Sequence, residues 1–268
     1  MKPKVFLDGD IVKVDQKRLE ALTPGVLKAK GVFETMRFEN GKILALDAHL
    51  KRLFKGLKFQ NIQSPHSIRK LRDLILSFSQ ANSRRPAKIR LVVWQQKSRV
   101  RTAIMSEPVS VSALPRGYRV IISKTIRPKS QLSHLKSLDY SCFRQAFLEA
   151  KALGYDEAIL LNREGKIVEG SRTNIFLVKD KILYTPSLKC GCLNGITRQM
   201  ILRIARQHKI SCRVVKVPQQ SLLKADEAFL TNSVLGVVPL TKVNDNVLNK
   251  GRTGQLTRFF RKAYENLH

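Results

Sequence analysis

The stretch at residues 136–174 constrains the fold most, because it encodes one helix and three strand-like runs joined by short turns. Apolar residues recur at spacings of three and four over 138–153, and Gly154 follows them, which predicts a helix that ends there. The strand-like runs cover residues 158–162, 166–169 and 174–178. The sequence therefore predicts that Lys136 lies just before a helix and that Glu169 lies at a strand end, in or near the core.

Length and composition indicate a globular protein. The chain has 268 residues, 43% of them hydrophobic, which suits one large or two medium domains with a substantial core. No apolar run approaches the ~20 residues needed to span a bilayer, and the first ten residues lack the apolar stretch of a secretory signal. The four cysteines show no paired CxxC spacing, which favours reduced thiols and no metal site. We therefore expect a cytoplasmic protein without a membrane span.

The net charge of +30, from 50 Lys and Arg against 20 Asp and Glu, favours attraction to anions. The basic residues are scattered through every segment, however, without a dense arm or an aromatic-interleaved stripe. Solvated surface is the expected role of most of them. We predict no specific nucleic-acid partner, and nonspecific adhesion to polyanions at low salt.

The sequence predicts two α+β domains, at residues 1–117 and 118–268, because the segment ALPRGY at 113–118 interrupts two strand-like runs. In the first domain we expect strands around 4–7, 32–38, 43–46, 88–95 and 103–112, and helices at about 47–59 and 66–82. In the second we expect, besides the elements named above, strands near 119–122 and 227–230 and helices at about 197–208 and 251–266.

Five motifs follow one another along the chain: GVFETMRFENGK at 31–42, HLKRL at 49–53, KSLDY at 136–140, EGSRTNIFLV at 169–178 and GCLNGITRQ at 191–199. Together they resemble the class IV, or fold type IV, pyridoxal-phosphate enzymes. That family comprises branched-chain and D-amino-acid aminotransferases and aminodeoxychorismate lyases. The resemblance implies a small N-terminal lobe, a larger C-terminal lobe that binds the cofactor, the cofactor pyridoxal 5'-phosphate (PLP) between them, and a homodimer.

The resemblance assigns the two ends of the cofactor ring to Lys136 and Glu169. A partly deprotonated Lys136 amine would form the Schiff base with the PLP aldehyde and would later move the substrate proton. Glu169 would hydrogen-bond the pyridine nitrogen and keep it protonated, so that the ring accepts electrons. Burying this carboxylate unpaired would cost several kcal/mol, so we expect a cationic partner nearby.

Three elements are implied to bind the cofactor phosphate. Arg52 lies on a helix that we expect Asp47 to cap, and it can form a bidentate phosphate contact. His49, one turn earlier, has either a structural hydrogen bond or a direct catalytic role. The free amides of Ile196 and Thr197 open another helix. The remaining phosphate oxygen is assigned to the turn that contains Thr231, Asn232 and Ser233.

Other site residues are implied more loosely. Tyr140 either contacts the phenolic oxygen of the cofactor or packs in the core, and Asn174 orients the strand after Glu169. Phe33 and Thr35 alternate with their neighbours in VFETMR, so they share one strand face that could line the substrate pocket. Arg90 in KIRLVVW resembles an arginine that meets a substrate carboxylate.

Three functions are compatible with these observations. The favoured one is an aminotransferase acting on an amino acid and a 2-oxo acid through Lys136. The second is a 4-amino-4-deoxychorismate lyase that releases pyruvate and p-aminobenzoate, because Arg172 and Thr173, together with GVFETMR, are as compatible with that branch as with D-amino-acid aminotransferases. The segment EGSRTN also departs from the EGxGEN form of many branched-chain enzymes, so branched-chain specificity is not implied. The third is a nonenzymatic polyanion-binding protein, supported by the basic composition alone.

Overall fold

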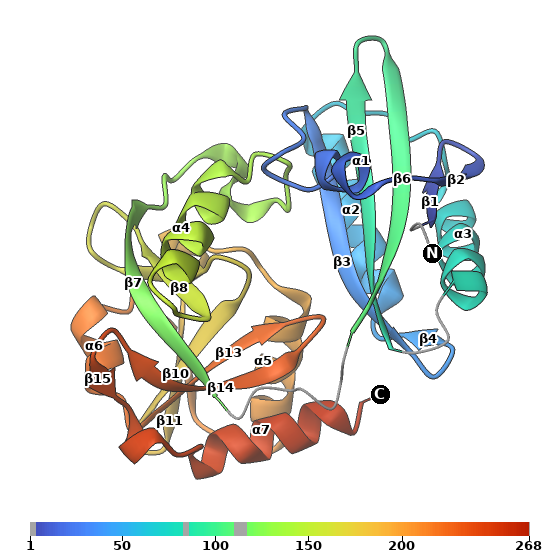
Figure 1. Cartoon of the computed structure of the whole chain (residues 1–268). Coiled ribbons are helices and arrows are strands. Elements are labelled where there is room, and N and C mark those ends of the chain that lie inside the picture. Colours follow the sequence, from blue (N-terminus) through green and yellow to red (C-terminus); the bar gives the residue numbers. More distant parts are fainter. Residues whose placement is uncertain (1–3, 83–85, 110–116, 268) are drawn as a thin grey trace. The chain divides into compact units, whose positions relative to one another are not determined.

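The computed structural model describes residues 4–82, 86–109 and 117–267. It divides into two compact units. Unit 1 comprises Met1–Ser112 and Leu135–Ser141, and unit 2 comprises Ala113–His134 and Cys142–His268. Part of the segment ALPRGY lies outside the described residues, so the domain boundary expected there stays a prediction. Figure 1 shows the course of the chain through the elements of each unit.

Unit 1 is built on a sheet that, in the described residues, has six antiparallel strands in the order β2-β1-β6-β5-β3-β4. The strands are β1 (Lys4–Leu7), β2 (Asp10–Lys13), β3 (Gly31–Glu39), β4 (Lys42–Ile43), β5 (Ala87–Gln96) and β6 (Arg99–Pro108). The helices are α1 (Gln16–Ala21), α2 (Leu46–Phe59) and α3 (Ile68–Asn82). Figure 1 shows α2 and α3 beside the sheet.

Two apolar clusters cover opposite faces of this sheet. Leu50, Leu53 and Leu57, spaced by three and four residues, are buried along one side of α2 and pack against β3 and β5. The cluster on the other face includes Phe33, Trp94 and Leu138. Phe33 and Thr35 alternate with residues of the first cluster, as their spacing predicts.

The segment Leu135–Ser141 belongs to unit 1, although our sequence analysis placed it in the C-terminal domain. Its backbone pairs with β3: the Phe33 N–H donates to the Lys136 carbonyl at 2.9 Å, and the Leu138 N–H donates to the Gly31 carbonyl at 3.0 Å. A Cβ at Gly31 would lie 2.5 Å from a backbone carbonyl of β5 and 2.8 Å from the Leu138 side chain. The close approach therefore requires glycine, and strand pairing decides where Lys136 lies.

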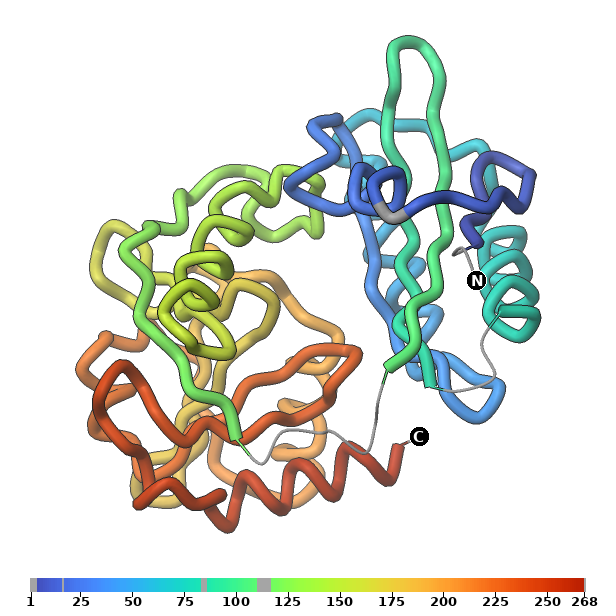
Figure 2. Tube along the Cα trace, viewed as in Figure 1, coloured from blue at the N-terminus to red at the C-terminus, as the bar shows by residue number. Residues whose placement is uncertain are grey.

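Unit 2 contains a sheet that has nine strands in the described residues, eight of them in the order β12-β11-β10-β13-β14-β7-β8-β9, with β15 on β14. These strands are β7 (Tyr118–Ile126), β8 (Glu157–Leu161), β9 (Ile167–Gly170), β10 (Asn174–Lys179), β11 (Ile182–Pro186), β12 (Cys212–Val215), β13 (Glu227–Asn232), β14 (Gly236–Val243) and β15 (Asn246–Val247). The helices are α4 (Ser141–Ala152), α5 (Ile196–Gln207), α6 (Gln219–Leu223) and α7 (Gln255–Glu265). Within unit 2, α7 runs beneath β13 and β14 (Figure 2).

Both units mix helices with largely antiparallel sheets, so the predicted α+β class is confirmed. Two details of the expected helices are wrong. Asp47 does not cap α2, because the helix already begins at Leu46, after Ala45 in a left-handed conformation; Asp47 lies in the first turn, where its carboxylate pairs with Arg72 of α3. The last helix begins at Gln255, four residues later than expected. In the described part of the chain, no helix is both long and apolar enough to cross a membrane.

Candidate active site

Lys136 lies beside two aromatic residues of unit 1. Its Nζ atom is 4.4 Å from the centroid of the Phe33 ring, and the Phe33 and Tyr140 rings meet edge to face at 5.4 Å between centroids. An aromatic face attracts an ammonium group, so this contact holds the amine at one place on the sheet. Three residues predicted from two separate motifs thus come together, and they do so through the pairing of Leu135–Ser141 with β3.

Arg52 and His49 converge on Glu34, the β3 residue that faces α2. Arg52 forms a bidentate pair with the Glu34 carboxylate, from Nε at 2.7 Å and from Nη2 at 2.6 Å. His49 Nδ1 lies 2.7 Å from the same carboxylate, which is 1% exposed. The two bonds to Arg52 fix the plane of its guanidinium group. His49 therefore has the structural hydrogen bond that was one of its two expected roles.

The electrostatics of this cluster follow from burial and from pairing. Burial alone would raise the pKa of Glu34, but the charge and hydrogen bonds of Arg52, and then of His49, lower it from 4.5 to about 2. Burial lowers the pKa of His49, although Glu34 opposes this. Near pH 7 the cluster thus contains a carboxylate, a guanidinium and a neutral imidazole that donates from Nδ1. Sequence reasoning named Arg52 and His49 but missed Glu34, which is distant from both in the chain.

Arg90 lies on the opposite face of the unit 1 sheet from Glu34, directly across from Thr35. Its Nη1 atom is 3.9 Å from Glu107, and its buried Nε and Nη1 atoms have no hydrogen-bond partner among the described residues. Burial lowers the pKa of Arg90, while Glu107 opposes this. An arginine with unsatisfied buried N–H groups is suited to receive a carboxylate.

Glu169 is 4% exposed at the end of β9 in unit 2. Its Oε2 atom accepts hydrogen bonds from the Leu193 N–H at 3.0 Å and from Asn174 Nδ2 at 3.3 Å. Asn174 Nδ2 also donates to the Leu193 carbonyl at 2.9 Å. The charge of Glu169, after those of Cys192 and Cys212, raises the pKa of Arg198, whereas burial, the largest effect, lowers it; the cationic partner expected for Glu169 stays a prediction.

The loop after Leu193 leads into α5, whose N-cap is Gly195. The first N–H groups of a helix have no acceptor within the helix, so those of Ile196 and Thr197 are suited to an anion. A Cβ at Gly195 would lie 2.0 Å from Asn174 Oδ1, so glycine is required where the loop passes Asn174. Asn174 thereby connects the glutamate to the start of α5.

The turn after β13 lies beside this helix start, since Thr197 Oγ1 and Ser233 Oγ are 3.5 Å apart. Thr231 Oγ1 is buried without a hydrogen-bond partner in the described residues. Asn232 Oδ1 accepts from the backbone N–H groups of Val234 and Leu235 at 3.0 and 2.8 Å, so this side chain shapes the turn. The N–H groups at the start of α5 and the Thr231 hydroxyl suit a phosphate, and the Glu169 carboxylate suits a pyridine nitrogen. These groups therefore fit a phosphorylated pyridine.

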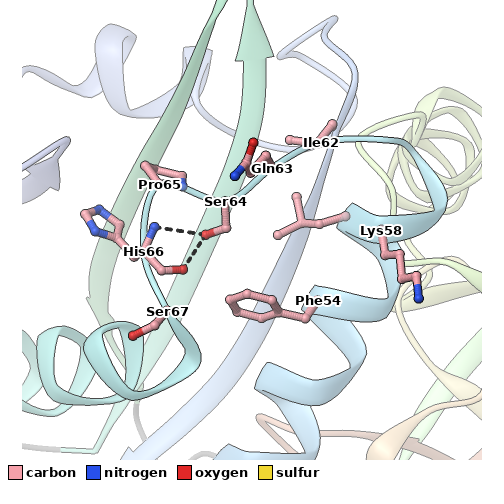
Figure 3. A pocket seen from close by; sticks show the side chains of 9 residues that line it. Phe54, Lys58, Ile62, Gln63, Ser64, Pro65, His66 and Ser67 are labelled. Carbon is pink, nitrogen blue, oxygen red and sulfur yellow. Dashed lines mark hydrogen bonds between the residues drawn. The ribbon is translucent and has the colours of Figure 1, made fainter.

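Two other features do not belong to this arrangement. Burial raises the pKa of the Cys192 thiol to about 12, so this cysteine is an inert core residue. A pocket of about 460 Å³ lies between α2 and the segment before α3, and Figure 3 shows the side chains that line it. Its lining residues, none of which is an expected site residue, are Phe54, Leu57, Lys58, Ile62, Gln63, Ser64, Pro65, His66 and Ser67. In the described residues, no three or more His, Cys, Asp or Glu side chains are grouped so that they could hold a metal ion.

Comparison with known proteins decides the family, because residues 31–243 match the family model of amino-transferase class IV. The chain belongs to this family. A branched-chain-amino-acid aminotransferase of Pseudomonas aeruginosa is 30% identical over 98% of this chain and 92% of its own length. An aminodeoxychorismate lyase of Bacillus subtilis is 29% identical over 97% and 93%. Among solved structures, a T.th. branched-chain amino acid aminotransferase with pyridoxamine 5'-phosphate has a TM-score of 0.86 and 27% identity, over 99% of this chain and 94% of that one.

Membership of the class IV family confirms the resemblance drawn from the five motifs, and with it an enzyme of the PLP-dependent aminotransferase type. It favours the two enzymatic readings over a nonenzymatic polyanion-binding protein. The residue assignments rest on the geometry described above.

Proposed function

We propose that this enzyme transfers the amino group of an amino acid with an apolar side chain to a 2-oxo acid. The observation that carries the proposal is the contact of Lys136 Nζ with Phe33, at 4.4 Å, on the aromatic face of unit 1. The amine proposed to react thus lies against an apolar surface, which suits an apolar substrate side chain. The near-complete alignment with a branched-chain enzyme supports the choice of side chain.

The cofactor, when bound, supplies an aldehyde and an electron-accepting ring. Lys136 supplies the amine that attaches it and afterwards moves the proton of the substrate α-carbon. Glu169, held by Leu193 and Asn174, keeps a proton on the ring nitrogen. Tyr140 lies within ring contact of Phe33 and is proposed to face the phenolic oxygen.

The phosphate is proposed to meet the guanidinium of Arg52, the amides of Ile196 and Thr197, and the turn at Thr231 and Asn232. The role of Glu34 is to hold the Arg52 guanidinium in one orientation. Fixing donors before the ligand arrives avoids the cost of ordering them on binding.

Substrate recognition is proposed for the face of the unit 1 sheet that lies opposite Glu34. Phe33 and Thr35 share that face, and Arg90 lies across from Thr35 with buried donors suited to a carboxylate. Replacing Arg90 with Leu should raise KM for the 2-oxo acid more than it lowers kcat, because the contact binds ground state and transition state alike.

A paired assay tests the proposal. Keto-acid-dependent amino transfer from a panel of D- and L-amino acids is measured beside pyruvate release from aminodeoxychorismate, with Lys136→Ala as the control. We expect turnover in the first assay and its loss in the variant. Activity confined to the second assay would establish the lyase instead, and borohydride trapping at a lysine other than Lys136 would refute the assignment of the reactive amine.

A homodimer is part of the proposal, because the resemblance to the family implies one. Light scattering of the purified enzyme measures the mass directly. A fully active monomer would contradict this part and leave the assignment of the reaction intact.

A further inference from the structure

The carboxylate of Glu157, at the start of β8, is fully buried and surrounded by hydrogen-bond donors. Oε1 accepts from the N–H groups of Ala158 at 2.9 Å and Ser171 at 3.1 Å, and from the Ser171 hydroxyl. Oε2 accepts from the Arg172 N–H at 3.1 Å, and the Thr173 hydroxyl lies 3.5 Å away. One side chain thus contacts three consecutive residues far from it in sequence.

These three residues form the whole connection between β9 and β10. Glu169 lies two residues before the connection, and Asn174 follows it directly. The Gly170 N–H donates to the Thr173 carbonyl at 2.8 Å, which closes the turn. Because a buried carboxylate costs several kcal/mol unless its oxygens are bonded, the turn and Glu157 are mutually dependent. Movement of the turn would alter the 3.3 Å contact of Asn174 with Glu169.

The side chain of Arg172 takes no part in this contact. Its guanidinium lies 3.5 Å from the centroid of the Phe147 ring on α4, and the residue is exposed. The Glu157 carboxylate therefore binds the backbone of the turn, whereas the Arg172 side chain packs on Phe147 of α4. The two contributions can be separated by mutation.

We infer that Glu157 is a positioning residue for the cofactor: through the 171–173 turn it sets the orientation of Glu169 toward the pyridine nitrogen. The inference rests on the proposed role of Glu169. Glu157 itself touches neither cofactor nor substrate. Glu157 thereby affects the affinity for PLP and the protonation of the ring nitrogen.

The test compares Glu157→Gln with Glu227→Gln. Glu227 also lies in unit 2, accepts backbone N–H bonds from Leu256 at 3.1 Å and Thr257 at 2.8 Å, and accepts from the Thr257 hydroxyl at 2.8 Å. It serves the start of α7 and has no assigned role at the site. Each substitution removes one charge, keeps the size of the side chain and turns one acceptor into a donor.

Three quantities are measured: the dissociation constant for PLP, the pH midpoint of the absorbance of bound PLP, and the unfolding temperature of the cofactor-free protein. We expect Glu157→Gln to weaken PLP binding about tenfold and to move the midpoint by about 0.5 pH unit or more. Glu227→Gln should lower the unfolding temperature and leave the other two quantities at wild-type values. Arg172→Ala should leave the midpoint unchanged.

A Glu157→Gln protein that unfolds at lower temperature but binds PLP with wild-type affinity and midpoint would overturn the inference and leave Glu157 a structural residue. If that variant does not fold, Ser171→Ala removes one donor and should shift the midpoint of the folded protein by a smaller amount; no shift would overturn the inference equally. Wild-type protein that binds no PLP would instead refute the proposed function.

Discussion

Glu34 offers the sharpest test of the electrostatics in unit 1. In Glu34→Gln, the Arg52 guanidinium, 14% exposed, loses its anionic partner, and one oxygen facing donors becomes an N–H group. The lowering of the Glu34 pKa from 4.5 to about 2 corresponds to about 3 kcal/mol, at about 1.4 kcal/mol for each tenfold change in proton affinity. Breaking a buried ion pair typically costs about 3 to 5 kcal/mol. We therefore expect the variant to lose about 3 kcal/mol of unfolding free energy at pH 7.

The assay is urea unfolding followed by tryptophan fluorescence. The chain has one tryptophan, Trp94, and it is 4% exposed in the core of unit 1, so its signal reports that unit. Because the folded pKa of Glu34 is depressed, its contribution is complete above about pH 4.5 and is lost as the pH falls toward 2. The difference in unfolding free energy between wild type and variant should therefore disappear over that pH range. Glu107→Gln, a half-exposed partner of Lys88, should cost less than about 1 kcal/mol. A loss below about 1 kcal/mol for Glu34→Gln at pH 7, or a gap that persists on acidification, would refute the reasoning.

Three further predictions concern other parts of the chain. Burial lowers the pKa of His49, so the unfolded chain binds this proton more tightly and stability falls as the pH drops below about 6.5; His49→Gln should remove up to about 1.4 kcal/mol per pH unit from that slope in the same urea assay. Gly195→Ala would place a methyl group 2.0 Å from Asn174 Oδ1 and should weaken PLP binding about tenfold in an absorbance titration. Gly254→Ala would place one 1.8 Å from the Glu227 carboxyl carbon and should lower the unfolding temperature seen by circular dichroism without changing that titration.

Strong periodicity made much of the secondary structure predictable. The helix α2 and the strands β3 and β5 have long, regular apolar patterns, and their observed bounds differ from the expected ones by one residue at each end or less. The strand β14 was missed because Pro239 lies within it, and proline argues against an interior strand. The structure accommodates Pro239 because pairing of β14 with β7 begins only at Leu240.

Site residues were predictable where a motif named them, and their partners were not. Arg52 was identified from its helix, but its partner Glu34 is 18 residues away and becomes a neighbour only when α2 packs on β3. Glu157 is likewise 14 residues from Ser171. Such contacts depend on the register between elements, which a single sequence does not specify.

The pairing of Leu135–Ser141 with β3 means that neither unit is one continuous stretch of polypeptide. No single cut in the chain can release either unit whole, and a fragment that stops before residue 135 would leave the Gly31 end of β3 paired with β5 alone. Insertions in the segments on either side of Leu135–Ser141 would change how this part of the chain returns to pair with β3. These segments are therefore where length variation should be least tolerated during evolution or engineering.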